Sequence, residues 1–230
     1  MAKLCQCKSS GMITSSLICE CGHGRAVIKD YTKRLFKWVV TIPYSPVYRY
    51  IYSSVGRLEN ELEWYNVLKD RFSIPRFLAY CTKPKARLLR EYVDGSPLAN
   101  TEAPKAWSLA GARLASLHEE LGVALGDPNP GNFIYDGEDL WLVDLEQASA
   151  FTSERAAWDI LVFASTALVL SSLNRYNLVQ AALRAYRESL SDEMWSSIKR
   201  ALMVWRIMVL NPLLAIPVYN IRLMRFLASL

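Results

Sequence analysis

The stretch that decides the fold runs from Gly126 to Glu146 and reads GDPNPGNFIYDGEDLWLVDLE. Two short runs rich in β-branched and aromatic residues, 132–135 and 140–143, flank the turn sequence Asp-Gly-Glu-Asp at 136–139. This pattern predicts a β-hairpin. Folding that hairpin would bring the residue before its first strand close to the residue after its second.

Three polar side chains of this stretch suit phosphate chemistry. The hairpin would bring Asn132 and Asp144 to one end of the ribbon, and Asp127 precedes Asn132 in the adjoining loop. Phosphoryl transfer from ATP needs a carboxylate that orients the acceptor hydroxyl, and an amide oxygen and a second carboxylate that hold the magnesium ions. Asp127, Asn132 and Asp144 supply these groups in that order. The alternative is an ordinary hairpin flanked by solvated aspartates, which is common for either half taken alone.

Both motifs resemble those of the protein-kinase-like superfamily, and above all its small atypical branches. These include RIO-type kinases, the kinase subunit of the tRNA-modifying KEOPS complex, lipopolysaccharide-sugar kinases and aminoglycoside phosphotransferases. Their Gly-Asp-x-x-x-x-Asn loop and Asp-Phe-x segment are matched by residues 126–132 and 144–146. The resemblance implies one kinase-like α+β domain with ATP and Mg²⁺ as cofactors. Its N-lobe (1–93) would hold a small antiparallel sheet plus a helix, and its C-lobe (94–230) would be mainly helical.

The resemblance also points to groups that position the phosphates. The segment 24–29 looks like the strand whose lysine binds the α- and β-phosphates. A lysine in such a short apolar strand is unusual unless its ammonium has a partner. The implied partner of Lys29 is a glutamate on the next helix, where Glu61 shares the apolar face and Glu63 is the second choice. The alternative is that Lys29 and Glu61 are separate solvated charges.

Two further segments are expected to contact the nucleotide. A phosphate-covering loop should precede the lysine strand by one strand, where small residues let backbone N–H groups approach phosphate oxygens. That loop would consist of Ser9, Ser10 and Gly11. In the family, backbone groups of the hinge between the lobes hold the adenine. The matching positions are Glu91, Tyr92 and Val93.

Asp159 matches the buried aspartate that braces the catalytic loop from the following helix in the family. A capping or solvated role is the alternative. His118, near the end of an amphipathic helix, is expected to be structural because nothing in the motif asks for a base there.

Departures from the family pattern narrow the range of acceptor molecules that we expect. Asn129 stands where serine/threonine protein kinases have a lysine, and Glu146 replaces the glycine of Asp-Phe-Gly. The 14 residues between Asp144 and Asp159 leave no room for a long activation loop. We therefore expect an ATP-dependent kinase whose hydroxyl acceptor is a small molecule, a glycolipid, or a serine or threonine of a specific protein partner. The alternatives are a pseudokinase or scaffold, or an ATPase subunit of a complex.

Composition fits a compact enzyme. Of 230 residues, 52% are hydrophobic, which leaves little room for disorder. A formal charge of +5 is a mild bias toward anionic partners. The first residues lack the apolar run of a signal peptide, so a cytoplasmic location is expected.

The cysteines form two close pairs and one single residue. Cys5 and Cys7, and likewise Cys19 and Cys21, are spaced so that both thiols of a pair share one face of a strand. Cross-strand thiols, reduced or as disulfides, are favoured over a four-thiolate metal site, because zinc ribbons prefer two intervening residues. Cys81 is expected to be a lone core thiol.

Two regions are candidates for other partners. Residues 31–57 contain five basic residues, seven aromatic residues and no acidic one. They would form either a surface for RNA, an anionic membrane or a sugar, or a loop packed on the helix that carries Glu61. The apolar C-terminus, 201–230, is interrupted by arginines and prolines, so no transmembrane helix is expected. Core helices are favoured there over a peripheral membrane surface.

Overall fold

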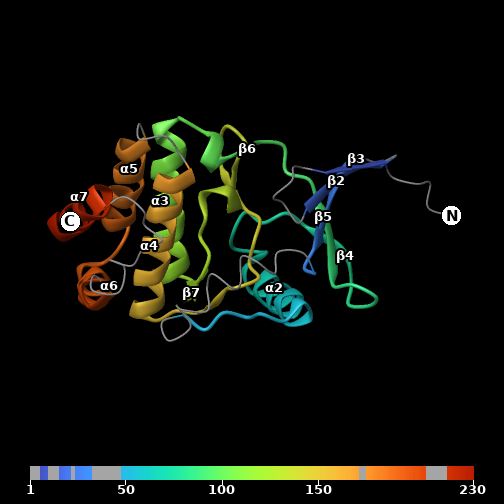
Figure 1. Cartoon of the computed structure of the whole chain (residues 1–230), viewed down its shortest axis with the longest axis horizontal. Coiled ribbons are helices and arrows are strands. Elements are labelled where there is room, and N and C mark those ends of the chain that lie inside the picture. Colours follow the sequence, from blue (N-terminus) through green and yellow to red (C-terminus); the bar gives the residue numbers. More distant parts are fainter. Residues whose placement is uncertain (1–5, 10–15, 22–23, 33–47, 171–174, 206–216) are drawn as a thin grey trace. The chain divides into compact units, whose positions relative to one another are not determined.

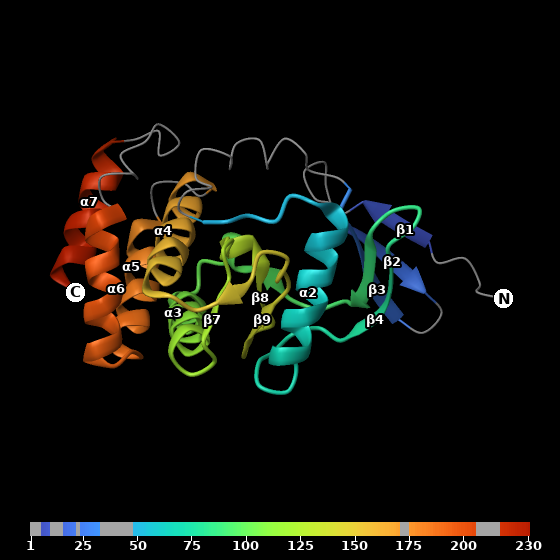
Figure 2. The ribbon, with the colours of Figure 1, turned by 90° about the horizontal axis from the view of Figure 1, so that it is seen from below.

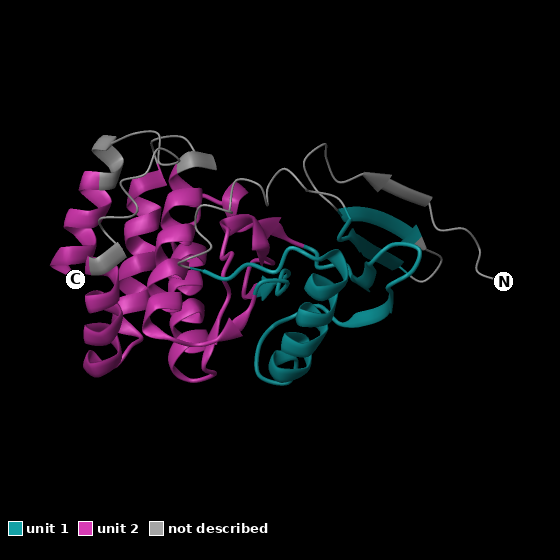
Figure 3. Ribbon diagram, turned by 60° about the horizontal axis from the view of Figure 1, so that its bottom comes forward, with its two compact units in different colours: residues 1–94, 141–147 teal, residues 95–140, 148–230 magenta. Residues whose placement is uncertain are grey.

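The computed structural model describes residues 6–9, 16–21, 24–32, 48–170, 175–205 and 217–230. The chain divides into two compact units (Figure 3). Unit 1 comprises residues 1–94 and 141–147, and unit 2 comprises residues 95–140 and 148–230. The chain leaves unit 1 after Asp94 and returns to it for the seven residues 141–147. The expected division at residue 93 assigned these seven residues to the C-lobe.

Unit 1 is built on a five-stranded antiparallel sheet with the order β1-β2-β3-β5-β4. Figure 1 labels the strands β2 to β5 of this sheet. Its strands are β1 (Gln6–Ser9), β2 (Ser16–Cys21), β3 (Gly24–Asp30), β4 (Phe77–Cys81) and β5 (Arg87–Glu91). In the ladder between β3 and β5, Val27 faces Arg90 and Lys29 faces Leu88. Residues paired across an antiparallel ladder project to the same face of the sheet. These four side chains therefore share one face.

Helix α2 (Ser54–Leu68) packs on the sheet of unit 1. The hydroxyl of Ser53 caps its first turn by accepting a hydrogen bond from the Gly56 N–H at 3.3 Å. Leu58 of the helix joins Tyr31 and Leu88 in a fully buried apolar cluster. The helical periodicity that places Leu58 in this cluster also directs Glu61, one turn later, toward the sheet.

Unit 2 is mainly helical (Figure 2). Its long helices are α3 (Pro104–Glu119), α4 (Ser153–Leu170), α5 (Tyr176–Glu188), α6 (Asp192–Trp205) and α7 (Pro217–Ser229). Pro104 occupies the first turn of α3, where its missing N–H would be unpaired in any case. Helices α3 and α5 approach closely at Gly111, because a Cβ atom there would lie 1.8 Å from the carbonyl oxygen of Ala182.

Short strands complete the fold. β6 (Ser96–Pro97), β8 (Phe133–Tyr135) and β9 (Leu140–Leu142) form a three-stranded sheet, with the 3₁₀ turns η2 (Leu98–Asn100) and η3 (Pro130–Asn132) before β8. β7 (Val123–Ala124) pairs with β10 (Ser149–Ala150). In the turn between β8 and β9, the Asp136 carboxylate accepts from the N–H groups of Glu138 and Asp139, and Gly137 has a φ of 111°. The hairpin predicted from the sequence is confirmed.

The C-terminal helix α7 packs into unit 2 through Leu223, Met224 and Leu227, which are buried. This packing agrees with the prediction of core helices for this part of the chain, whereas residues 206–216 lie outside the described residues. No helix in the described ranges combines the length and apolarity that a bilayer crossing requires.

Candidate nucleotide and metal site

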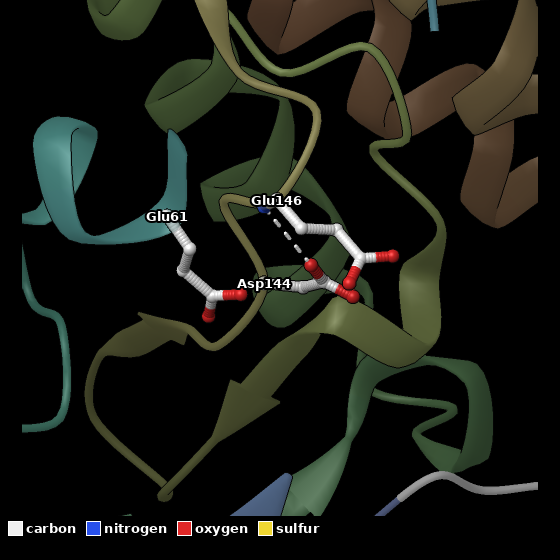
Figure 4. A group of neighbouring side chains, drawn as sticks. All are labelled: Glu61, Asp144 and Glu146. Atoms are coloured by element: carbon white, nitrogen blue, oxygen red, sulfur yellow. Dashed lines mark hydrogen bonds between the residues drawn. The ribbon is translucent and has the colours of Figure 1, made fainter. Parts of the chain in front are cut away.

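A buried charge cluster lies within unit 1. The Nζ atom of Lys29 in β3 lies 2.5 Å from Glu61, 2.8 Å from Asp144 and 3.2 Å from Glu146. Figure 4 shows that Glu61 extends from α2, whereas Asp144 and Glu146 extend from the segment after β9. One oxygen of each lies within 4.8 Å of the others. The expected pairing of Lys29 with Glu61, rather than Glu63, is therefore present.

Burial and charge shift the pKa values of this cluster in a consistent way. Burial alone would lower the pKa of Lys29, but the carboxylates of Asp144, Glu146 and Glu61 raise it above its ordinary value, so the ammonium stays charged. Burial raises the pKa of Glu61 to about 7, although Lys29 opposes the shift. The neighbouring carboxylates of Asp144 and Glu146 raise the pKa of Glu61 as well, so Glu61 retains a proton more readily than an exposed glutamate.

Glu146 is held by a second cation that the sequence did not single out. Both oxygens of Glu146 lie 3.3 Å from the Nη1 atom of Arg57, and Arg57 also donates to the carbonyl oxygen of Tyr31. The side chains of Arg57 and Glu146 are 4% and 2% exposed. Of the two alternatives for residues 31–57, the packed one therefore holds for Arg57, because its guanidinium neutralises Glu146 inside unit 1.

The segment that carries Asp144 is fixed along its length. The Nδ2 atom of Asn60 on α2 donates to the carbonyl oxygens of Leu145 and Glu146 at 3.4 and 3.2 Å. The amide of Gln147 exchanges two hydrogen bonds with the backbone of Ile51 at 2.8 and 3.0 Å. These bonds fix the backbone on both sides of Glu146. The fixed backbone in turn helps to position the carboxylates of Asp144 and Glu146.

A buried aspartate braces the loop of unit 2 that contains Asp127. Asp159 on α4 is 0% exposed and accepts from the N–H groups of Leu125 and Gly126 at 2.6 and 2.7 Å. It also lies 3.1 Å from Nε2 of His118, a buried residue. Gly126 has a φ of 73°, which a glycine adopts without strain. The bracing role of Asp159 is present, and the solvated alternative is excluded by its burial.

Asp127 and Asn132 are linked inside the same loop. The Asn132 side-chain amide donates to the Asp127 carbonyl oxygen at 2.9 Å, which leaves its Oδ1 atom as an acceptor. The carboxamide oxygen of Asn129 accepts from the Gly131 N–H at 2.8 Å and closes the turn that leads into η3. Asp127 and Asn132 belong to unit 2, whereas Lys29 and Asp144 belong to unit 1. The convergence of Asn132 with Asp144 stays a prediction.

The other expected nucleotide contacts have different outcomes. Ser10 and Gly11 lie outside the described residues, and only the backbone of Ser9, at the end of β1, is described. Glu91 ends β5, and its side chain lies 2.7 Å from that of Arg76 at the surface. Tyr92 and Val93 follow it and precede the point where the chain leaves unit 1. Their contact with a base stays a prediction.

The segment 31–57 and the cysteines carried further predictions, of which the one for Cys81 is wrong. Tyr48 and Tyr50 are buried, and the Tyr48 hydroxyl donates to the Gln147 carbonyl oxygen, which favours the packed-loop interpretation for the described part. Residues 33–47 lie outside the described residues. Cys19 faces Cys7 in the ladder and is disulfide-bonded, so its sulfur is not a free metal ligand. Cys81 is exposed on β4, not in the core, because β4 is an edge strand.

Comparison with known proteins supports the fold and little more. No protein-family model matches the chain, and no curated protein matches it. The crystal structure of choline kinase LicA from Streptococcus pneumoniae superposes with a TM-score of 0.51 at 13% identity, over 98% of this chain and 95% of that one. The structure of WbdD matches with a TM-score of 0.45 at 16% identity, over 88% of this chain and 50% of that one. This chain thus spans half the length of WbdD. The expected fold class is confirmed: the protein has an α+β kinase-like fold.

Proposed function

We propose that the protein is an ATP-dependent, magnesium-requiring kinase that transfers the γ-phosphate to a hydroxyl group. The observation that carries this proposal is the contact of Lys29 with both Glu61 and Asp144 in a buried cluster. A lysine placed between a helix glutamate and the carboxylate after a hairpin is the arrangement that phosphoryl transfer uses to position phosphates. The kinase-like fold and the braced Asp127 loop support the same function.

Each residue then has a distinct role. Glu61 holds Lys29 extended from β3, and Lys29 contacts the phosphates with an ammonium that stays protonated. Asp127, on the loop braced by Asp159, orients the acceptor hydroxyl and accepts its proton. Arg57 keeps the charge of Glu146 compensated while Lys29 turns from the carboxylates to the phosphates.

The donor set fits magnesium. Mg²⁺ prefers oxygen ligands, and Asp144 and Glu146 present carboxylate oxygens within one small cluster. Asp144 and Asn132 would hold the metal. When bound, the metal neutralises the charge that develops on the phosphates. Lys29 contacts Asp144 at 2.8 Å, so this carboxylate would become available to the metal once the ammonium turns to the phosphates.

A small hydroxylated molecule is the acceptor that best fits the chain. Only 14 residues separate Asp144 from Asp159, and the segment between them contains the short strand β10 and the first turn of α4. No long segment remains there on which a peptide substrate could dock. The acceptor of LicA is choline according to its name, and identity of 13% does not transfer that substrate to this chain.

The test is calorimetric titration of the full chain with Mg·ATP. We expect magnesium-dependent binding that is lost in Asp144→Asn and retained in Asp70→Asn, which changes an exposed aspartate in the same unit. An acceptor screen over sugars, lipids and amino alcohols should then detect transfer that Asp127→Ala abolishes while it still binds ATP. Binding without any transfer would identify a pseudokinase or scaffold, and strong residual transfer by Asp127→Ala would refute the assigned role.

A further inference from the structure

Arg90 in β5 is a buried cation that the proposed chemistry does not use. It is 8% exposed. Among the described residues, four arginines have a buried Nε atom without a hydrogen-bond partner: Arg57, Arg90, Arg113 and Arg175. Three of them donate through their terminal nitrogens to a carboxylate or a carbonyl oxygen. Arg90 forms no hydrogen bond through its side chain and no ion pair in the part of the chain that the structure describes.

The sheet register places Arg90 beside the Lys29 cluster. Arg90 faces Val27, and Lys29 faces Leu88, so Arg90 and Lys29 are diagonal neighbours on one face of the sheet. Burial lowers the pKa of Arg90, and the nearby charges of Glu61 and Asp144 oppose that shift. The guanidinium therefore lies within electrostatic reach of the carboxylates but is hydrogen-bonded to none of them.

A buried guanidinium without acceptors indicates a ligand that brings them. Arginine has five N–H donors and no acceptor, and its burial is costly unless those donors are satisfied. Arg90 immediately precedes the proposed base-binding residues, 91–93. The ligand atoms closest to it along the strand would thus belong to the nucleobase. Guanine presents two acceptors, N7 and O6, on the edge that arginine recognises with two parallel hydrogen bonds, whereas adenine pairs the N7 acceptor with an N6 donor.

We propose that Arg90 reads the edge of the purine base, and that the site therefore accepts GTP at least as tightly as ATP. This inference rests on the proposed nucleotide site and extends it to the choice of base. Lys29 and the carboxylates bind the triphosphate of either nucleotide. Arg90 would donate two hydrogen bonds to guanine, at N7 and O6. To adenine it would donate only one, at N7, and its second donor would face the N6 donor of the base unfavourably.

The test compares nucleotide affinities of the full chain in the presence of Mg²⁺. GTP should bind the wild type as tightly as ATP or more tightly. Inosine triphosphate should bind like GTP because it retains O6 and N7. Arg90→Met should weaken GTP binding by about tenfold to a hundredfold, the usual value of a bidentate base contact, and leave ATP binding unchanged or tighter.

Two variants control for folding and for charge. Arg90→Met removes an unpaired buried charge, so its urea midpoint should not fall below that of the wild type. Arg90→Lys keeps the charge but loses the planar fork, so it should also lose the preference for guanine. Arg71→Met, at an exposed arginine, should change neither affinity. ATP binding with much weaker GTP binding, or a GTP-to-ATP ratio that Arg90→Met leaves unchanged, overturns this inference alone. Failure of both nucleotides to bind overturns the proposed function together with it.

Discussion

The buried pair of Arg57 and Glu146 predicts an asymmetry between two neighbouring substitutions. In the wild type two cations, Lys29 and Arg57, face three carboxylates inside unit 1. Arg57→Met leaves three carboxylates with one cation. Glu146→Gln leaves two carboxylates with two cations and keeps an amide oxygen that accepts from Arg57. We therefore expect Arg57→Met to be far more destabilising.

The geometry sets the size of the effect. At 3.3 Å and an effective dielectric constant of about 20, the attraction between the two charges is about 5 kcal/mol before desolvation. Removing one partner of a buried pair typically costs about 3–5 kcal/mol, because the other charge stays buried. Arg57→Met should lie in this range, since it also removes the donor to the Tyr31 carbonyl oxygen. Glu146→Gln should cost about 1–2 kcal/mol, the value of weakened hydrogen bonds to a charged group.

Urea unfolding of the wild type, both single variants and the double variant measures this prediction. The double variant should be less destabilised than the sum of the two single variants by at least about 2 kcal/mol. Each single variant leaves a buried group without its charged partner, and the second substitution removes that group. Arg76→Met is the control: Arg76 lies 2.7 Å from Glu91, but the two side chains are 69% and 43% exposed, so its loss should cost less than about 1 kcal/mol. Additive single effects, or equal costs for Arg57→Met and Arg76→Met, would refute the reasoning.

Two further predictions concern stability. The Asp30 carboxylate accepts from the Thr32 N–H and hydroxyl and from Arg87, which together outweigh burial and lower its pKa below the ordinary 3.8. Asp30→Asn should therefore lower the free energy of unfolding by about 1–3 kcal/mol at pH 7. This loss should shrink as the pH falls through 3.8 and vanish below the depressed pKa of the folded state. A cost that does not change with pH in urea titrations would contradict this prediction. Gly111→Ala should destabilise unit 2 by about 3 kcal/mol or more, since its Cβ would clash with Ala182 on α5, and an unchanged thermal midpoint would show that the helices can separate freely.

Local patterns along the chain predicted the parts of the fold that depend on short-range physics. The turn at 136–139 and its flanking apolar runs specify a hairpin by themselves. The helical period placed Glu61 on the apolar face of α2, and that face is the one that meets Lys29. The hairpin and the apolar face of α2 could be predicted without the tertiary fold. Each depends only on residues that are close together in the sequence.

The partners of Glu146 could not be predicted in the same way. Arg57 lies 89 residues earlier in the chain, at the start of a helix where a basic residue is ordinarily solvated. Only tertiary packing shows that it points toward the sheet. Arg90 did carry a local signal: it alternates with the apolar Leu88, as Lys29 alternates with Val27. The signal was weaker than for Lys29, because β5 also carries the charged residues Arg87 and Glu91.

The charges of unit 1 give a physical reason for the proposal that a metal and a polyphosphate bind together. Lys29 and Arg57 carry two positive charges against three carboxylates. When Glu61 is ionised, the guanidinium of Arg90 brings the formal sum to zero without a hydrogen bond to any of these carboxylates. A divalent cation placed alone in this neutral, buried cluster would leave two positive charges uncompensated. A polyphosphate placed alone would leave its larger negative charge uncompensated. The magnesium complex of the nucleotide brings positive and negative charge together. Its phosphates and base would then offer acceptors to Lys29 and to Arg90, and Arg90 has no acceptor among the described residues of the free protein.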